Sequence, residues 1–188
     1  MSKQDDILNA AEALFDARGF HAVGIDAVIE RAGVSPRTLY RHFASKNVLV
    51  AAVLKHRDQR FWSFYEASAA KHLSAHGDPV LAAVDAMGDW LTEESHHGCL
   101  FLKALGEFAE DEPAIIEVSR AHKQKLLADL CARAKHHTAD NAQVLGRQLF
   151  LLVEGAMAEA RLFGAHEATD YARAAAWALV QQPVVAPE

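Results

Sequence analysis

Apolar residues recur at the spacing of an α-helix along almost the whole chain, and this pattern constrains the fold more than any other feature. Near the start, Ile7, Leu8, Ala11, Leu14 and Phe15 lie at i, i+1, i+4, i+7 and i+8, which places them on one face of a helix. The sequence contains no alternating apolar and polar run with hairpin turn residues. It therefore predicts an all-α protein.

Glycine, proline and capping residues divide this pattern into about nine helices. Two early helices are expected over residues 3–18 and 25–32, a third begins at Pro36, and a fourth starts near Ser45 and runs through Leu73. Later helices are expected over residues 79–94, 99–109, 113–136, 141–163 and 169–181, and the final "PVVAPE" is expected to be a frayed tail.

A glycine turn joins two of the short helices. Gly33 ends the second helix, Ser35 is placed to cap the third, and Pro36 occupies its first position, where a missing N–H costs nothing. Two helices joined by such a short turn are typical of a helix-turn-helix unit.

The charge of the chain is unevenly distributed. The total is −6, yet residues 31–60 hold seven lysine and arginine residues against Asp58 alone, so this stretch carries +6 and the rest carries −12. A basic end on an acidic protein is suited to approach a polyanion while the remainder keeps the protein soluble. This asymmetry indicates a nucleic-acid site at one end.

The third helix offers the cations for such a site. At 100° per residue, Leu39 and Phe43 share an inward face, and Arg37 and Arg41 point away from it. Guanidinium groups read guanine edges in the major groove, whereas hydroxyl, imidazole and ammonium groups contact phosphates. The bland alternative is a solvated helix face. The candidate DNA-binding residues are Ser35, Arg37, Thr38, Tyr40, Arg41, His42 and Lys46.

Four segments, "ILNAAEALFDARGF", "AVIERAGVS", "TLYRHFASK" and "VLVAAVL", carry a resemblance to a known family. In order and spacing they resemble the N-terminal domain of the TetR family of bacterial transcriptional regulators, over about residues 3–55. Further along, only "GCLFLKALGEF" and the succession of helices look similar. The resemblance implies a dimeric, all-helical repressor whose affinity for DNA is switched by a small ligand.

The expected organisation is a three-helix DNA-binding domain over residues 1–45 and a helical effector-binding and dimerisation bundle over residues 46–188. Two positions depart from the family pattern. Gly24 stands where members usually have a serine or threonine that caps the second helix and touches a phosphate, and Ile29 stands where alanine is frequent.

The two last long helices are the candidates for a dimer interface, because they are apolar on more than one face. An entirely intramolecular role for these faces is the alternative. The candidate interface residues are Leu149, Leu152, Val153, Ala156, Met157, Ala160, Ala172 and Ala176.

Aromatic and flexible apolar residues gather in the middle helices, as expected for a small-molecule site in a helical bundle. Plain core packing is the alternative for each residue. Asp89, Glu93 and Glu107 would favour a cationic effector, or would simply be solvated. The candidate ligand-binding residues are Phe61, Trp62, Tyr65, Met87, Trp90, Leu91, Phe101, Leu105 and Phe108.

No metal site or cofactor is predicted. "HHGC" contains His96, His97 and Cys99, and a second pair is His136 and His137. Adjacent histidines on a helix point about 100° apart, whereas zinc ligands are usually two to four residues apart, and no acidic or cysteine partner completes a set. Cys99 and Cys131 form no CxxC pair and are interpreted as buried thiols.

The sequence contains no GxSxG, P-loop, GxGxxG or HExxH motif, so it does not indicate an enzyme. It has no apolar stretch of about 18 residues that would span a membrane and no basic, apolar secretory leader, which predicts a cytoplasmic protein. The expected function is regulation of transcription through double-stranded, pseudo-palindromic operator DNA, with release by a small, largely apolar or aromatic effector. A helical scaffold whose basic end docks an acidic protein is the competing hypothesis.

Overall fold

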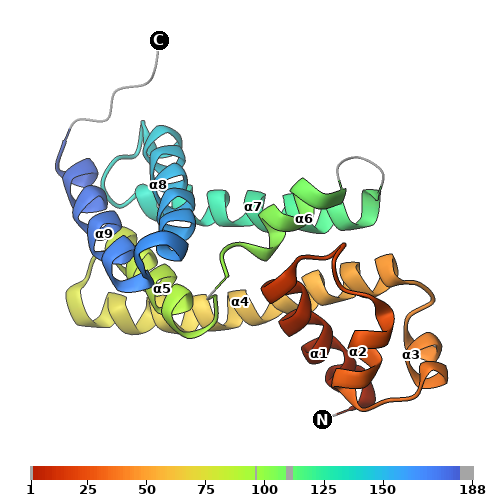
Figure 1. Ribbon diagram of the computed structural model, residues 1–188. Helices are drawn as coiled ribbons and strands as arrows, with labels where there is room; N and C mark the ends of the chain where they lie inside the picture. Colours follow the sequence, from red (N-terminus) through yellow and green to blue (C-terminus); the bar gives the residue numbers. More distant parts are fainter. Residues whose placement is uncertain (1, 96, 109–111, 183–188) are drawn as a thin grey trace. The chain divides into compact units, whose positions relative to one another are not determined.

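The computed structural model describes residues 2–95, 97–108 and 112–182, and within these ranges it contains nine α-helices and no strand (Figure 1). The all-α prediction is therefore confirmed. The helices are α1 (Lys3–Arg18), α2 (Ile25–Ala32), α3 (Pro36–His42), α4 (Lys46–His76), α5 (Pro79–Glu93), α6 (Leu100–Phe108), α7 (Pro113–Ala134), α8 (Ala142–Phe163) and α9 (Ala165–Gln181). The expected tail at 183–188, the end of the sixth helix at 109 and His96 lie outside the described residues.

The chain divides into two compact units. Unit 1 comprises Met1–Arg60 and Cys99–His122, and unit 2 comprises Phe61–Gly98 and Lys123–Glu188. These units differ from the predicted domains, because the first half of α4 and all of α6 pack into the same apolar core as α1, α2 and α3. That core includes Leu49 and Leu54 of α4 and Leu100 of α6, each fully buried.

Local capping determines where the helices of unit 1 begin and end. The side chain of Ser2 accepts a hydrogen bond from the Asp5 N–H, and Asp5 accepts one from the Ser2 N–H, which forms a capping box at the start of α1. Gly33 ends α2 in the left-handed conformation, with φ of 63°, which glycine adopts without steric cost.

Unit 2 is built around α5, α8 and α9, with the second halves of α4 and α7. Two glycines allow close approach of these helices. A Cβ atom at Gly88 of α5 would lie 2.2 Å from Cγ2 of Thr169 on α9, and one at Gly146 of α8 would lie 2.5 Å from the Cα atom of Cys131 on α7. A side chain at Gly88 would therefore collide with the Thr169 side chain, and one at Gly146 would collide with the backbone of α7.

Helix α9 begins four residues before the expected start at Thr169. Thr169 is therefore an interior residue of the helix. Its hydroxyl donates to the carbonyl of Ala165, 2.7 Å away, within the helix. The start is at Gly164, whose φ of 102° ends α8 and begins α9.

Both cysteines are free thiols. Cys131 is buried as predicted, whereas Cys99 is only partly buried, against the core of unit 1. Within the ranges described, no helix is both long enough and apolar enough to cross a membrane.

Candidate nucleic-acid interface

Helix α3 is placed in the chain by its N-terminal cap. The Ser35 hydroxyl accepts a hydrogen bond from the Thr38 N–H at 3.1 Å and lies 2.9 Å from the Thr38 hydroxyl. Pro36 occupies the first turn, as its lack of an N–H allows. This cap determines the position at which the helix starts and therefore the direction in which each following side chain points.

The apolar side of α3 faces the core of unit 1. Leu39 is fully buried and Phe43 is 3% exposed, so the opposite side of the helix faces solvent. Arg37, Tyr40 and Arg41 lie on that exposed side. The predicted orientation of the helix is thus confirmed, whereas contact with DNA stays a prediction.

The remaining candidate DNA-binding residues differ in exposure. Ser35 is exposed, and Thr38, His42 and Lys46 are half-buried at the edges of the exposed face. Among the described residues, neither Arg37 nor Arg41 forms an ion pair with an acidic side chain. Their guanidinium groups are therefore available to an external anion, at a helix that the core holds in one orientation.

Not every cation of the basic stretch belongs to this surface. Arg57 is 4% exposed and pairs with Glu12 at 2.8 Å, and Arg60 pairs with the same carboxylate oxygen at 3.0 Å. These two arginines tie α4 to α1. The charge count of the sequence could not distinguish them from the exposed arginines of α3.

The start of α2 also lies in this unit. Gly24 caps the helix through its extended backbone, with φ of −78° and ψ of 157°, and supplies no side-chain hydrogen bond. Nothing lies within 4 Å of the position a Cβ would take. Ile29 packs partly buried against the core of unit 1, so the departure from alanine is accommodated.

The nine residues predicted to bind a ligand are divided between the two units. Phe101 and Phe108 of α6 are buried in the core of unit 1, and Leu105 packs against it. Ring centroids of Phe108 and Phe20 are 5.5 Å apart. The other six residues belong to unit 2, and all of them are buried: Phe61, Trp62, Tyr65, Met87, Trp90 and Leu91.

Four of those six form an aromatic cluster, defined here as Phe61, Trp62, Tyr65 and Trp90. Phe61 stacks on Tyr65 with ring centroids 5.4 Å apart and meets Trp62 and Trp90 edge-on at 5.2 Å. These are the favourable geometries for aromatic pairs. The four buried side chains, three on α4 and one on α5, are thus in contact with one another.

One end of the aromatic cluster is polar. The Tyr65 hydroxyl donates to Oδ2 of Asp129 at 2.7 Å, and Nε of Arg133 donates to the same oxygen at 2.6 Å. Burial, and then the negative charge of Asp129, raise the pKa of Tyr65 well above its ordinary value. The hydroxyl therefore stays protonated and serves as a donor. Lys125 lies over the Trp62 ring, 3.9 Å from its centroid.

Unit 2 also contains an open hollow, which is a second candidate for a ligand site. A hollow of about 850 Å³ lies between the α4–α5 turn and α9, and none of the nine predicted ligand residues lines it. Charged, imidazole and apolar side chains line it. Helical periodicity in the sequence does not predict that these residues lie together. They are His76, Gly77, Asp78, Leu81, His136, Asp170, Arg173, Ala174 and Trp177.

Most of the predicted interface residues are buried within the single chain. Their contact with a partner chain stays a prediction. Leu152 and Ala160 are half-buried, and the other six are buried: Leu149, Val153, Ala156, Met157, Ala172 and Ala176. Helical spacing identified an apolar face correctly but could not say whether it packs within the chain.

A different stripe of α8 is exposed. Leu151 and Leu162 are 65% and 76% exposed, and Gly155 and Ala158 are exposed between them at spacings of four, three and four residues. These four residues are called the α8 stripe. Phe163, at the end of the same helix, is 64% exposed.

Two of the three acidic residues considered for a cationic effector accept hydrogen bonds within the protein. Asp89 accepts hydrogen bonds from Ser68 and His72, and Glu107 accepts from the N–H groups of Phe20 and His21. Glu93 is exposed. None of the three lines the hollow.

One of the adjacent histidines lies close to a carboxylate. Nε2 of His137 lies 3.1 Å from Oδ2 of Asp78, and His96 lies outside the described residues. The structure instead brings together His72, His76 and Asp85. The spacing of four residues between His72 and His76 was the signal in the sequence, but their carboxylate partner lies on the next helix.

Comparisons with known proteins agree with this architecture. Residues 7–53 match the family model described as bacterial regulatory proteins, tetR family. The HTH-type transcriptional activator FasR of Mycolicibacterium smegmatis is 36% identical over 93 residues, which cover 50% of this chain and 42% of that protein. The HTH-type transcriptional repressor Rv3405c of Mycobacterium tuberculosis is 30% identical over 127 residues, which cover 68% of this chain and 62% of that protein.

Structural similarity extends over nearly the whole chain. The crystal structure of a TetR-family transcriptional regulator from Streptomyces coelicolor superposes with a TM-score of 0.84 at 26% identity, over 95% of this chain and 94% of that chain. The chain spans only about two fifths to three fifths of the length of the two curated relatives named above. All three proteins are named as transcriptional regulators, which supports the prediction that the chain is not an enzyme.

Proposed function

The chain belongs to the TetR family of bacterial transcriptional regulators, and from this premise we propose that it binds a pseudo-palindromic operator in duplex DNA as a homodimer, in the cytoplasm. A small molecule bound in unit 2 releases it, so that it acts as a repressor. The observation that carries the proposal is the exposure of Arg37 and Arg41, without acidic partners among the described residues, on a capped helix whose other face is buried.

Helix α3 is the reading element. Laid in the major groove, it presents Arg37 and Arg41 to guanine edges, where each bidentate pair discriminates by about 1–3 kcal/mol. Thr38, Tyr40 and His42 flank these arginines and contact phosphates. Lys46, at the first residue of α4, contributes a positioning contact that carries no sequence information.

A homodimer follows from the geometry of a pseudo-palindrome, whose half-sites lie about 34–36 Å apart. The α8 stripe supports this assembly, because Leu151 and Leu162 expose most of their apolar surface and the small residues between them permit two helices to cross closely. In this proposal the α8 stripe, rather than the buried face predicted from sequence, contacts the partner.

The effector acts through α4, which contributes residues to both units. We place the effector in the hollow beside α9, because its volume suits a small molecule and no ring has to move. The aromatic cluster is the alternative, and would suit the apolar or aromatic effector that the sequence predicts. The effector changes operator affinity only through its different affinities for the two conformations of the protein.

The decisive experiment selects an operator from random duplex DNA with the full chain and measures its affinity at two salt concentrations. We expect affinity to fall steeply with salt, as phosphate contacts require. Arg41→Ala should cost about 1–3 kcal/mol and relax specificity at particular bases, whereas Lys46→Ala should weaken all sequences evenly. Equal effects of both variants on operator and random DNA, or no sequence preference at all, would favour the acidic-protein scaffold instead.

The dimer has its own test. Leu162→Glu should produce a monomer in light scattering and weaken operator binding roughly 100-fold, because two linked half-site contacts become one. Leu73→Glu on α4 is the matched control, since Leu73 is 39% exposed and lies outside the α8 stripe. A Leu162→Glu protein that stays dimeric would exclude the α8 stripe as the interface.

The effector site is located with a hit from a thermal-shift screen. Trp177→Ala should abolish the shift if the ligand occupies the hollow, whereas Trp62→Ala should do so if it occupies the aromatic cluster. A hit that raises the melting temperature but leaves operator affinity unchanged would contradict ligand-controlled release.

A further inference from the structure

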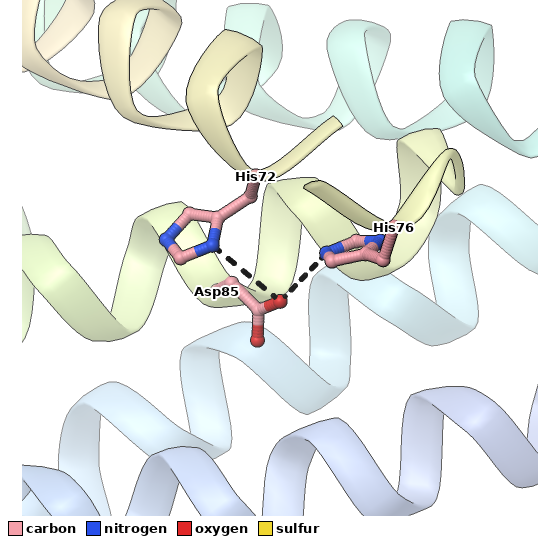
Figure 2. A group of neighbouring side chains, drawn as sticks. All are labelled: His72, His76 and Asp85. Atoms are coloured by element: carbon pink, nitrogen blue, oxygen red, sulfur yellow. Dashed lines mark hydrogen bonds and ion pairs between the residues drawn. The ribbon is translucent and has the colours of Figure 1, made fainter. Parts of the chain in front are cut away.

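We propose that His72, His76 and Asp85 form a binding site for a divalent transition-metal ion in unit 2. Figure 2 shows the three side chains converging between the end of α4 and the middle of α5. Each offers one ligand atom, and the three atoms all lie within 4.8 Å of one another. This site is separate from the DNA-reading helix, and its existence does not depend on the proposed function.

The spacing of the ligand atoms suits a small cation. His72 and His76 are four residues apart and share one face of α4. Nε2 of His76 lies 3.0 Å from Oδ2 of Asp85, and Nδ1 of His72 lies 3.9 Å from the same oxygen. Tetrahedral zinc with bonds of about 2.0–2.1 Å places its ligand atoms roughly 3.3 Å apart. The observed separations lie on either side of this value, so a small movement of the imidazoles admits the ion.

The second ring nitrogen of His72 is held by a carboxylate. His72 Nε2 lies 2.9 Å from Oδ2 of Asp89, which also accepts a hydrogen bond from the Ser68 hydroxyl at 2.5 Å. Both groups approach the same carboxylate oxygen of Asp89, so Nε2 of His72 is the donor and Nδ1 presents its lone pair toward Asp85.

Such a carboxylate behind a histidine is the usual arrangement that orients a metal ligand and determines its tautomer. The carboxylate ligand is oriented in a similar way. Nε of Arg173, on α9, donates to Oδ1 of Asp85 at 2.7 Å, which leaves Oδ2 directed at the two histidines. A bound ion would therefore join α4 to α5 directly, and α9 through Arg173.

The ligand set selects the class of ion. Two imidazole nitrogens and one carboxylate oxygen suit Zn²⁺, Co²⁺ or Ni²⁺, whereas Mg²⁺ and Ca²⁺ prefer oxygen ligands only. Three protein ligands leave at least one coordination position for water or another donor. The side chains of His72 and His76 are 26% and 25% exposed, so an ion can reach them from solvent.

Without an ion, the same side chains form a set of histidine–aspartate pairs, and the test has to separate the two interpretations. The full chain, free of any affinity tag, is titrated with Co²⁺ while its visible absorption is followed, and then with Zn²⁺ against a chromophoric chelator. We expect one ion per chain, a Co²⁺ spectrum typical of nitrogen and oxygen ligands, and a higher melting temperature with Zn²⁺.

His76→Gln is the decisive variant, because the loss of His76 leaves the Asp85–Arg173 pair intact. It should weaken Zn²⁺ binding at least tenfold and abolish the Co²⁺ spectrum. Asp89→Asn should weaken binding roughly 10- to 100-fold, as for other groups that orient a metal ligand. Circular dichroism checks that each variant is folded.

Two controls make the result specific. His166→Gln changes an exposed histidine of α9, and His137→Gln changes the histidine that pairs with Asp78. Both should bind Zn²⁺ as the unmodified chain does. Unchanged affinity in His76→Gln, or an equal loss in His137→Gln, would overturn the proposal and leave His72, His76 and Asp85 as structural ion pairs.

Discussion

Arg57 of α4 donates a hydrogen bond from Nη1 to Oε1 of Glu12 of α1 across 2.8 Å, with both side chains almost completely buried. The pair lies inside unit 1, and Arg60 completes it from the surface at 3.0 Å. An arginine that contributes to the basic character of the sequence thus acts as a structural group.

Removing one member of this pair should be costly. Arg57→Met leaves the Glu12 carboxylate buried beside the partly exposed Arg60, and loss of one partner of a buried pair typically costs about 3–5 kcal/mol. Urea unfolding of the variant measures this cost. The double variant Arg57→Met with Glu12→Leu should recover much of it, because no charge then remains buried. Arg37→Ala, at an exposed cation, should change stability by less than about 0.5 kcal/mol, and a similar value for Arg57→Met would refute the structural role.

Glu107 of α6 holds the turn between α1 and α2. Its two carboxylate oxygens accept hydrogen bonds from the N–H groups of Phe20 at 3.0 Å and His21 at 2.7 Å. Glu107→Gln replaces one acceptor by an amide donor, which should destabilise the protein by about 1–3 kcal/mol. Glu117→Gln, at an exposed position of α7, is the control, and equal midpoints for the two variants in urea would contradict this role.

Gly146 is required where α8 crosses α7. A Cβ atom there would lie 2.4 Å from Sγ and 2.5 Å from Cα of Cys131, so Gly146→Ala should lower stability by about 1–3 kcal/mol through overpacking. Gly106→Ala offers the opposite case, because Gly106 is an exposed residue of α6 with nothing within 4 Å. It should raise stability by about 0.5–1 kcal/mol, which is the gain in helix propensity. Thermal unfolding of both variants tests the contrast in sign.

A substitution at Gly24 should raise the stability of the protein. Its backbone is extended and its surroundings are empty, so Gly24→Ser fits and adds a hydroxyl that caps α2, for a gain of a few tenths of a kcal/mol. If that hydroxyl also reaches a phosphate, as the family pattern implies, operator affinity should rise. Gly24→Ala lacks the hydroxyl and should give neither gain. Equal stability and operator affinity in the serine and alanine variants would show that the hydroxyl contributes nothing.

The sequence alone predicted the features that depend on neighbours along the chain. The cap at Ser35 and Pro36, the stop at Gly33 and the inward face of Leu39 and Phe43 all follow from spacing and local chemistry, and each is observed. Hydrogen bonds and helical periodicity act over three or four residues, so one sequence contains the information they need. The family relationship rests on the same stretch, residues 7–53.

The tertiary structure decided which of several equivalent surfaces meet. From the sequence, Phe101 and Phe108 were candidates for a ligand site, but in the structure they lie in the core of unit 1. On α8, the face that carries Leu149 is buried and the α8 stripe is exposed. Asp85 reaches His72 and His76 only because α5 folds back on α4. The hydrophobic effect is non-directional, so burial is favourable for any apolar helix face. Periodicity therefore identifies an apolar face, whereas the packing of distant segments determines what that face contacts.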